Sequence, residues 1–435
     1  MWRSEQIELM SEQIAPIVEH LKTTYRDPEQ MMQLYSDKQA DVFEMCSLAA
    51  GIPGICIVVS VLDQLYPQEN WQPIGHQYAL KLQSMLNEAD VQSIGLWTGL
   101  TGVAQAFRLL SNEQRAYRQV IQTLDEFMID QLHELIDHAT DNLHGNVEMS
   151  DYDVIEGLTG IGRYFIQYYD RDHPAVIDII QYMIQLTESF VHDQQLVPGW
   201  YISSANQFLL HEQAKYAQGN FNLGLSHGIA GPLALLSTAW CKAIELPGQY
   251  EAIQTIVDFY QANSSSDEIG TIWPERISFE HYSGSEFMVD IRNNESWCYG
   301  YPAICNALLL ASEALQNNEL QHDTLQALSG LAKRELQQLS IHSPTFCHGY
   351  AGLLHMNAHI QLRYPLPELM AVNDRLLQQM MKSFDPQQPL GFLNVEYEES
   401  SPHPGLLTGS AGILLVLAEY MHGHHSSWDH IFLLH

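Results

Sequence analysis

Residues 409–418, with the sequence GSAGILLVLA, combine two features that recur along the chain: a pair of glycines three positions apart and an apolar run directly after it. Glycine lets the backbone turn sharply and approach its neighbours closely. A run that is apolar nearly all round predicts a buried helix. This stretch therefore predicts a tight turn that leads into a core helix.

The same pattern occurs seven times, and its repetition decides the fold class. The first glycines of the seven units are Gly51, Gly99, Gly157, Gly228, Gly300, Gly349 and Gly409. In the unit at Gly300, Ala303 replaces the second glycine. More amphipathic segments, such as 117–135 and 320–339, lie between the apolar runs. Repeated helix pairs stack to share a core. We therefore expect an all-α protein with two concentric rings, in which the inner helices all begin at one end.

Two intervals, residues 195–224 and 262–296, lack helical periodicity and have the composition of strands or loops. We expect them to form irregular or strand-like excursions over the mouth of the inner ring, where functional residues often gather. No low-complexity tract or linker separates parts of the chain. Residues 1–435 are therefore expected to form a single domain.

The charge balance restricts the partners. The chain has 19 Lys and Arg against 52 Asp and Glu, a formal net charge of −33. Binding to nucleic acid or to an anionic membrane needs a basic face, so neither is expected. A cationic peptide fits the charge better, although solubility alone also accounts for an acidic surface.

Three features that the sequence lacks indicate where the protein is located in the cell. The first residues, MWRSEQ, have no apolar core or cleavage-site pattern of a secretory signal. No stretch approaches the roughly 20 apolar residues of a membrane span. The six cysteines are few, and most lie in apolar helical runs, as reduced core thiols do. We expect a cytoplasmic protein without direct membrane insertion.

A possible metal site lies beside the glycines. Cys298 precedes Tyr299 and Gly300, and Cys347 and His348 directly precede Gly349. If the glycine-marked helix starts share one end, these side chains converge there. Two Cys and one His are a three-ligand zinc set that leaves the fourth position open for a substrate. Taken singly, each of these residues could instead belong to the core. Their equivalent positions in successive repeats favour a zinc site.

Four segments carry a resemblance to a known family: 152–160 (YDVIEGLTG), 226–231 (SHGIAG), 297–300 (WCYG) and 347–349 (CHG). With them, the chain resembles the lanthionine cyclase (LanC-like) family, in particular the nisin-type cyclases of class I lantibiotic biosynthesis. The resemblance implies an α/α toroid with seven inner and seven outer helices and a small strand-containing extension.

The resemblance also implies an activity. A LanC-like cyclase closes lanthionine and methyllanthionine rings by adding a peptide Cys thiol to dehydroalanine or dehydrobutyrine. One Zn²⁺ per chain, bound by Cys298, Cys347 and His348, would turn the substrate thiol into a thiolate, since a free thiol with a pKa of ~8.5 is mostly protonated at neutral pH. The implied partners are a dehydrated precursor peptide with its leader, a dehydratase and an ABC exporter at the inner membrane face.

Roles for the neighbouring residues follow from the same resemblance. His227 is the family-matched candidate for acid–base catalysis, because an imidazole titrates near neutral pH. Asp153 would orient His227 or stabilise its cation, and capping a helix is an equally sound use of this residue. Tyr299 would donate a hydrogen bond or a proton to the enolate, and packing is its alternative role. Trp297 would shape the substrate pocket.

The sequence departs from the family pattern at one position. The family often has an arginine three residues before the Trp of the Trp-Cys block, but Asn294 stands there in this chain. Arg292 lies two residues further upstream and would reach the substrate pocket only through a shifted loop.

Three other functions compete with peptide cyclisation. A LanC-like enzyme that adds glutathione to an acceptor would have the same zinc ligands. A toroidal zinc-dependent prenyltransferase would need a basic pocket for a diphosphate, which so few Lys and Arg disfavour. A non-catalytic peptide-binding scaffold would hold zinc for structure, but structural zinc normally has four protein ligands.

Overall fold

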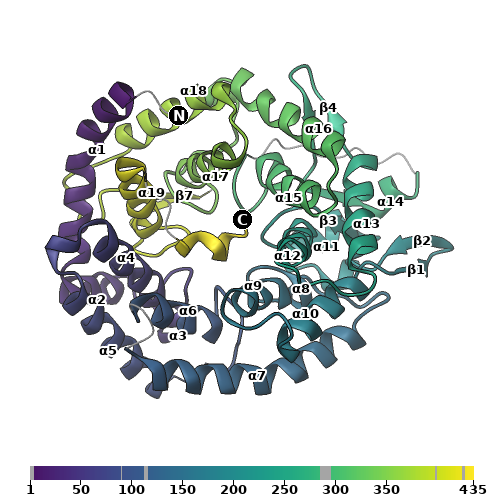
Figure 1. Ribbon diagram of the computed structural model, residues 1–435, viewed down its shortest axis with the longest axis horizontal. Helices are drawn as coiled ribbons and strands as arrows, with labels where there is room; N and C mark the ends of the chain where they lie inside the picture. The colour runs from purple at the N-terminus through teal and green to yellow at the C-terminus, as the bar shows by residue number, and fades with distance from the viewer. Residues whose placement is uncertain (1–3, 90, 112–115, 285–294, 397–398, 424–426) are drawn as a thin grey trace. The chain divides into compact units, whose positions relative to one another are not determined.

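The computed structural model describes residues 4–89, 91–111, 116–284, 295–396, 399–423 and 427–435. Helices dominate it, and its strands are few and short (Figure 1). The chain forms two compact units. Unit 1 contains Met1–Met128 and Ile341–Asp429, and unit 2 contains Ile129–Ser340 and His430–His435.

A buried helix follows each of the seven glycine motifs, as the sequence predicts. These helices are α4 (Ile52–Leu65), α6 (Leu100–Leu110), α9 (Leu158–Tyr168), α12 (Ala230–Cys241), α15 (Tyr301–Ala314), α17 (Tyr350–Arg363) and α19 (Ser410–His422). Close backbone approach explains the second glycine of the motif. In α17, a Cβ on Gly352 would overlap the carbonyl oxygen of Phe346, so a larger residue would push the helix start away from its loop.

More amphipathic helices alternate with the buried ones. They are α1 (Ser4–Tyr25), α5 (Gln72–Glu88), α7 (Arg118–Asp141), α10 (Pro174–Gln185), α13 (Gln249–Ala262), α16 (Asn318–Ser329) and α18 (Pro367–Lys382). The amphipathic segment expected over 320–339 is shorter in the structure. Helix α16 ends at Ser329, and two short 3₁₀ turns, Gly330–Lys333 and Leu336–Gln338, follow it. Glycine disfavours helix continuation at this point.

Five short helices complete the α-helices of the described chain. They are α2 (Pro28–Asp37), α3 (Val42–Cys46), α8 (Met149–Tyr152), α11 (Leu210–Lys215) and α14 (Phe279–Tyr282).

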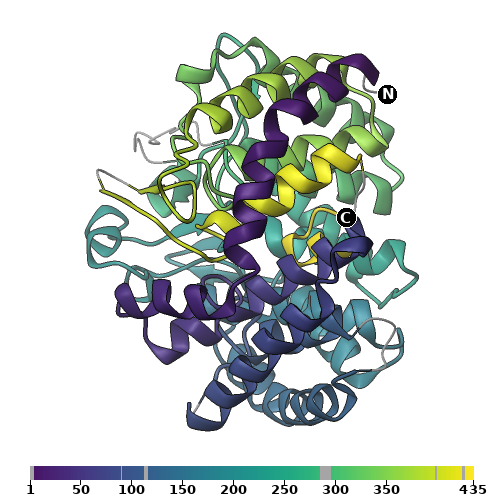
Figure 2. The ribbon, with the colours of Figure 1, turned by 90° about the vertical axis from the view of Figure 1, so that its left-hand side faces the viewer.

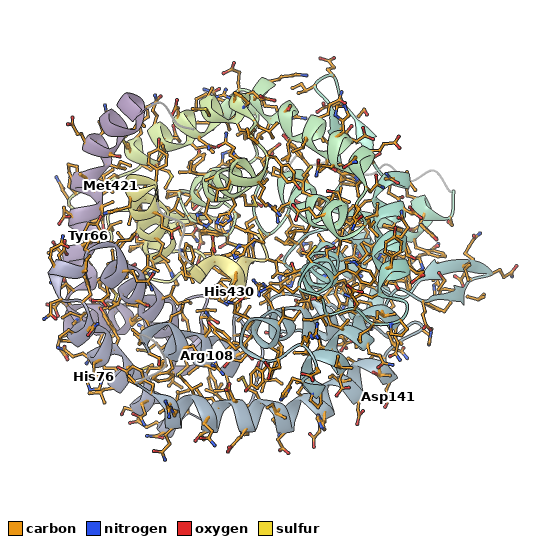
Figure 3. The ribbon with its side chains drawn as sticks, viewed as in Figure 1. Tyr66, His76, Arg108, Asp141, Met421 and His430 are labelled. Atoms are coloured by element: carbon orange, nitrogen blue, oxygen red, sulfur yellow. The ribbon has the colours of Figure 1, made fainter. Side chains whose placement is uncertain are left out.

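In unit 1, the buried helices of the two chain ends pack side by side. Helix α17 packs on α19, α19 on α4, and α4 on α6. Helix α1 lies along α19, so the first and last long helices of the chain are neighbours (Figure 2). Arg108 of α6, which is labelled in Figure 3, forms a 2.5 Å ion pair with Asp125 of α7. The contacts of α19 with α1 and α4 join sequence segments that lie hundreds of residues apart.

In unit 2, α12 packs between α9 and α15. Three of its strand pairs lie in or next to the two intervals that lack helical periodicity. They are β1 (Ser189–His192) with β2 (Gln195–Pro198), β3 (Asn220–Asn222) with β6 (Arg276–Ser278), and β4 (Ser265–Ser266) with β5 (Thr271–Ile272), all antiparallel. Unit 1 has a further antiparallel pair, β7 (Asn394–Glu396) with β8 (Glu399–Ser401).

None of the described helices combines the length and the apolar character that crossing a bilayer requires.

Candidate active site

The loops before the buried helices are joined to one another by backbone hydrogen bonds at one recurring position, two residues before the first glycine. In unit 1, the amide of Cys347 donates to the carbonyl of Leu407 at 2.8 Å, Leu407 donates to Ala49 at 2.9 Å, and Ala49 donates to Trp97 at 3.1 Å. The residues next to the glycines of four repeats therefore lie side by side at the starts of α17, α19, α4 and α6.

The loops of unit 2 are joined in the same way. The amide of Val154 donates to the carbonyl of Ser226 at 2.9 Å, and the amide of Ser226 donates to the carbonyl of Cys298 at 3.2 Å. The hydroxyl of Ser226 also lies 3.3 Å from the same carbonyl oxygen. Because His227 is the next residue, this contact places the backbone of His227 beside that of Cys298.

His227 and Asp153 form the closest side-chain pair of the predicted site residues. His227 Nδ1 lies 2.6 Å from Asp153 Oδ2, while Asp153 Oδ1 accepts hydrogen bonds from the amides of Glu156 and Gly157 at 2.8 Å each. The Asp153 side chain is 1% exposed, whereas that of His227 is 28% exposed. Asp153 therefore bridges the turn before α9, whose N-cap is Gly157, and contacts the His227 ring. Among the described residues, His227 Nε2 has no hydrogen-bond partner.

Tyr299 lies in a polar network that the sequence did not reveal. Its hydroxyl oxygen accepts a 2.9 Å hydrogen bond from Asn222 Nδ2, and an Arg276 nitrogen lies 3.5 Å away. Arg276 also forms a 2.5 Å ion pair with Glu212. Burial raises the pKa of Tyr299 to about 12, with Arg276 and Asn222 acting in the opposite direction. The phenol thus remains protonated, and able to donate, at neutral pH.

The strands of the two irregular intervals supply this network. Asn222 on β3 and Arg276 on β6 are cross-strand partners in the antiparallel pair. Gly224, just after β3, leaves room for Tyr299, because a Cβ at that position would lie 2.5 Å from the Tyr299 ring. For Asn222 and Arg276, the only sequence signal was their location in segments with the composition of strands. Arg292, the arginine chosen from the sequence, lies outside the described residues, as does Asn294.

Trp297 is a core residue of unit 2. Its side chain is fully buried, and its indole nitrogen donates a 3.0 Å hydrogen bond to the carbonyl of Phe432. A different aromatic residue borders His227: the ring of Phe208, which is 50% exposed, packs edge-on at 5.3 Å between centroids. These positions favour Trp297 as a support for the Cys298 loop and Phe208 as a wall of the accessible site.

In unit 1, Cys347 and His348 lie half-buried at the start of α17. Burial lowers the pKa of His348, which keeps the imidazole neutral, while the Glu396 carboxylate and the Asn394 side chain, both on β7, oppose this shift. His348 Nε2 is buried, and no described residue supplies it with a hydrogen-bond partner. A buried imidazole nitrogen without a partner is available to bind a metal ion.

Cys298, Cys347 and His348 are candidate metal-binding residues, and they fit zinc by type. Their thiols differ from those of the core. Burial raises the pKa of Cys46 to about 11 and shifts those of Cys56 and Cys305 even higher. Cys298 and Cys347 are only half-buried. The core thiols are therefore unsuited to the thiolate state that metal binding needs, while these two remain accessible.

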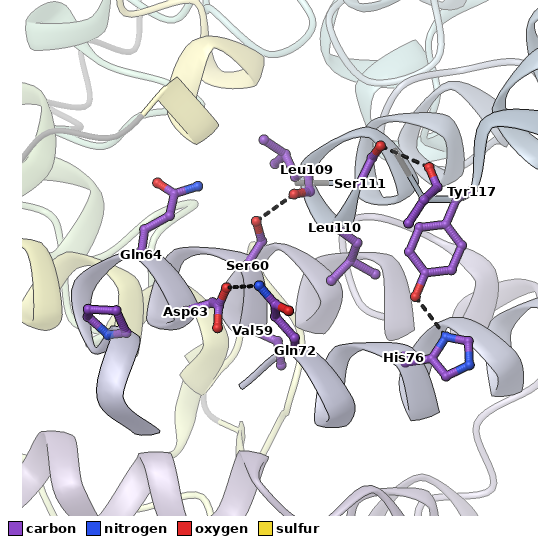
Figure 4. Close-up of a pocket in the computed structure, with 12 residues that line it drawn as sticks. Val59, Ser60, Asp63, Gln64, Gln72, His76, Leu109, Leu110, Ser111 and Tyr117 are labelled. Atoms are coloured by element: carbon purple, nitrogen blue, oxygen red, sulfur yellow. Dashed lines mark hydrogen bonds between the residues drawn. The ribbon is translucent and has the colours of Figure 1, made fainter. Parts of the chain in front are cut away.

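A pocket of about 780 Å³ in unit 1 lies apart from all these residues along the chain (Figure 4). It is lined by α4, α5 and α6 and by the segment that leads to α7. Several of its polar groups pair with one another, as in the 2.9 Å contact between His76 and Tyr117. It contains none of the predicted site residues.

Glu295 is a buried carboxyl just before the Cys298 loop. Although it accepts a 2.9 Å hydrogen bond from the Ser340 amide, burial dominates and raises its pKa from 4.5 to about 7. The folded protein therefore binds this proton more tightly than the unfolded chain does. As the pH rises from about 4.5 to about 7, the unfolded chain loses this proton first, so stability falls by an amount on the order of 3 kcal/mol.

A substitution tests this effect. Glu295→Gln should unfold at a higher urea concentration than the unmodified protein at pH 8, and at nearly the same concentration at pH 4.5, because only the charged carboxylate is penalised. Urea midpoints at the two pH values measure the difference. An equal effect of the substitution at both values would contradict a buried, titrating Glu295.

Comparison with known proteins identifies the family. A model of the family described as lanthionine synthetase C-like protein matches residues 42–433. The chain belongs to this LanC-like family. It is 26% identical, over 385 residues, to the nisin biosynthesis protein NisC of Lactococcus lactis subsp. lactis, covering 87% of this chain and 86% of that protein.

A solved structure supports the fold of this LanC-like chain. The structure of nisin cyclase matches with a TM-score of 0.79 and 23% identity, covering 93% of this chain and 96% of that chain. The predicted fold class, an all-α α/α toroid with few short strands, is thereby confirmed. The family is also known to bind metal, in agreement with the candidate ligands of this chain.

Proposed function

We propose that this chain is a zinc-dependent cyclase that joins Cys thiols to dehydroalanine or dehydrobutyrine within a lantibiotic precursor peptide. Membership of the LanC-like family, together with likeness to NisC and nisin cyclase, supports a lanthionine cyclase enzyme. The dependence on zinc and the peptide substrate are the proposed part. Likeness to proteins named nisin biosynthesis protein and nisin cyclase supports a precursor peptide as the substrate.

One observation within unit 2 supports catalysis most directly. His227, which pairs with Asp153, lies on a loop whose Ser226 amide donates to the carbonyl of Cys298. The proposed proton donor and a proposed thiolate ligand are therefore on neighbouring loops. The carbon that receives the proton lies next to the newly formed C–S bond. The proton donor must therefore lie close to the site that holds the substrate sulfur.

The proposed metal ligands are Cys298, Cys347 and His348. When bound there, zinc would lower the pKa of a substrate thiol so that the thiolate is present at neutral pH. The accessible thiols of Cys298 and Cys347 and the unpartnered Nε2 of His348 support this donor set. Three protein ligands leave a coordination position for the substrate, which is the pattern of catalytic zinc.

His227 is the proposed proton donor. Attack of the substrate sulfur on the β-carbon forms the C–S bond and moves the alkene electrons onto the carbonyl oxygen as an enolate. The α-carbon then needs a proton, and His227 Nε2 is the ring nitrogen that Asp153 does not contact. The Asp153 carboxylate would hold the His227 ring in the orientation that leaves Nε2 for the substrate.

Tyr299 is the proposed stabiliser of the enolate oxygen. Its phenol keeps its proton at neutral pH, because burial raises its pKa to about 12. Asn222 and Arg276 approach the oxygen of the phenol, so its O–H hydrogen is free to point toward the substrate. Asn222 and Arg276 would therefore act as positioning residues.

Tyr299→Phe should reduce the rate of ring formation roughly 10²-fold, the usual effect of removing one donor from an oxyanion site. Zinc content and folding should stay unchanged, because the ring and its packing remain. The cyclisation rate under single-turnover conditions measures the effect. A rate equal to that of the unmodified enzyme would leave Tyr299 a packing role only.

The decisive experiment uses a dehydrated precursor peptide that contains its own Cys, incubated with the purified zinc-loaded enzyme and without added thiol. Cyclisation does not change the mass, so the loss of free thiols is followed by alkylation and mass spectrometry. Loss of alkylation supports a peptide cyclase. An enzyme that uses glutathione would act only when glutathione is supplied and would add its mass. A non-catalytic scaffold would change nothing under either condition.

The proposed partners follow from the same function. A leader-bearing precursor peptide with basic residues would be attracted by the net charge of −33. A dehydratase must act before this enzyme, because the alkene acceptors have to exist before a thiol can add to them. Association with a dehydratase and an ABC exporter would bring the cytoplasmic enzyme to the inner membrane face through protein contacts.

A further inference from the structure

Unit 1 contains a second group of metal-ligand side chains that the proposed cyclase function does not use. His355 and His359 lie on α17, four residues apart, and Asp429 lies in the 3₁₀ turn Ser427–Phe432. Residues four apart on a helix share one face. All three side chains are buried: the exposed fraction is 3% for His355, 8% for His359 and 0% for Asp429.

The ligand atoms of this group converge on one point. His355 Nε2 lies 2.8 Å from Asp429 Oδ2, and His359 Nε2 contacts the same oxygen. One ligand atom from each of the three residues lies within 4.8 Å of the others. Two imidazole nitrogens and a carboxylate oxygen at this separation can contact a single metal ion after a small outward shift, since zinc–ligand bonds are about 2.0–2.2 Å long.

A fourth buried residue supports the orientation of His355. Glu419 of α19 is 2% exposed, and its Oε2 lies 4.0 Å from His355 Nδ1, on the side of the ring opposite Asp429. A carboxylate that faces the second nitrogen of a metal-bound imidazole is a common arrangement, because it fixes the ring and its tautomer. The rings of Phe346 and Trp428 pack against His355 at 5.6 and 5.2 Å between centroids.

The charge of the cluster also favours a cation. Asp429 and Glu419 bring two carboxylates into the core, where charge is costly. A divalent cation among the three ligands would offset this charge, and the two imidazole rings lie close enough to share it, with centroids 4.9 Å apart.

We propose that His355, His359 and Asp429 bind a second divalent transition-metal ion, of the zinc class, in addition to the ion at the cysteines. A donor set of two imidazoles and one carboxylate, without sulfur, suits Zn²⁺ and its first-row neighbours. The ion would fix Asp429 to α17. Although it has three protein ligands, its role is structural, because their burial keeps a substrate from the remaining coordination position and they are distinct from the residues of the proposed reaction.

Metal content tests the proposal independently of cyclisation. The unmodified protein, equilibrated with zinc and freed of excess metal by gel filtration, should contain about two zinc ions per chain, each at its own set of ligands. His359→Gln and Cys347→Ala should each lose one of them. His133→Gln, which alters an exposed histidine on α7, should retain both.

The coordination shell provides a second measurement that remains useful if His359→Gln folds poorly. X-ray absorption of Cys347→Ala should show zinc with nitrogen and oxygen ligands and no sulfur. The proposal would be overturned if the unmodified protein contained only one zinc per chain and Cys347→Ala removed it. His355, His359 and Asp429 would then contact one another without a metal ion. Retention of both ions by a folded His359→Gln protein would also overturn it. Neither result would affect the proposed cyclase site, because the zinc content of Cys347→Ala tests that site separately.

Discussion

Cys347→Ala is expected to slow ring formation by roughly 10³-fold or more and to remove the zinc ion of the proposed active site. A missing thiolate ligand destroys a three-residue zinc site, and loss of metal activation corresponds to several kcal/mol of transition-state stabilisation. The single-turnover rate on a dehydrated precursor and the sulfur signal in X-ray absorption measure the two effects.

A matched cysteine variant separates this effect from a general loss of thiols. Cys241 is exposed at the end of α12, far along the chain from any predicted ligand. Cys241→Ala should keep both the rate and the metal content. A Cys347→Ala protein that cyclises at the normal rate, with sulfur still bound to zinc, would refute the ligand assignment.

His227→Asn is expected to reduce the cyclisation rate by about 10²–10⁴-fold, the range for loss of a positioned acid or base. The fold and the zinc content should be retained, because His227 is not among the proposed ligands and its side chain is partly exposed. Single-turnover rates, together with metal analysis, measure these effects.

The control for this variant is a nearby histidine outside the pair with Asp153. His211 is exposed on α11, in the same interval of unit 2, and His211→Asn should leave the rate unchanged. A fully active, zinc-loaded His227→Asn protein would exclude His227 as the proton donor. Together with an inactive Cys347→Ala protein, it would assign protonation of the α-carbon to another group, such as Tyr299.

Local sequence patterns predicted the helical part of the fold well. Each of the seven apolar runs after a glycine motif is a buried helix, because periodicity and glycine placement act through neighbouring residues. The exception among the quoted segments is 320–339, where apolar spacing continued past Gly330 but the helix did not. The single-domain organisation over residues 1–435 stays a prediction.

The candidate site was predicted only in part, for a physical reason. The motif residues His227, Asp153 and Cys298 could be selected from the sequence because they stand at fixed positions beside the glycines. Asn222 and Arg276 occupy no such motif. They come to Tyr299 through pairing of β3 with β6, and cross-strand register over more than 50 residues of intervening chain cannot be read from local composition.

The sequence by itself determined the helix-rich repeat, the family and the residues that have metal-ligand or acid–base chemistry, because each depends on residue type and spacing along the chain. Only the tertiary structure decided which side chains face one another: Nδ1 of His227 toward Asp153, the oxygen of Tyr299 toward Asn222, and the imidazoles of α17 toward Asp429. Such contacts depend on the packing of segments far apart in the chain, where small differences in distance decide whether two groups can share a proton or a metal ion.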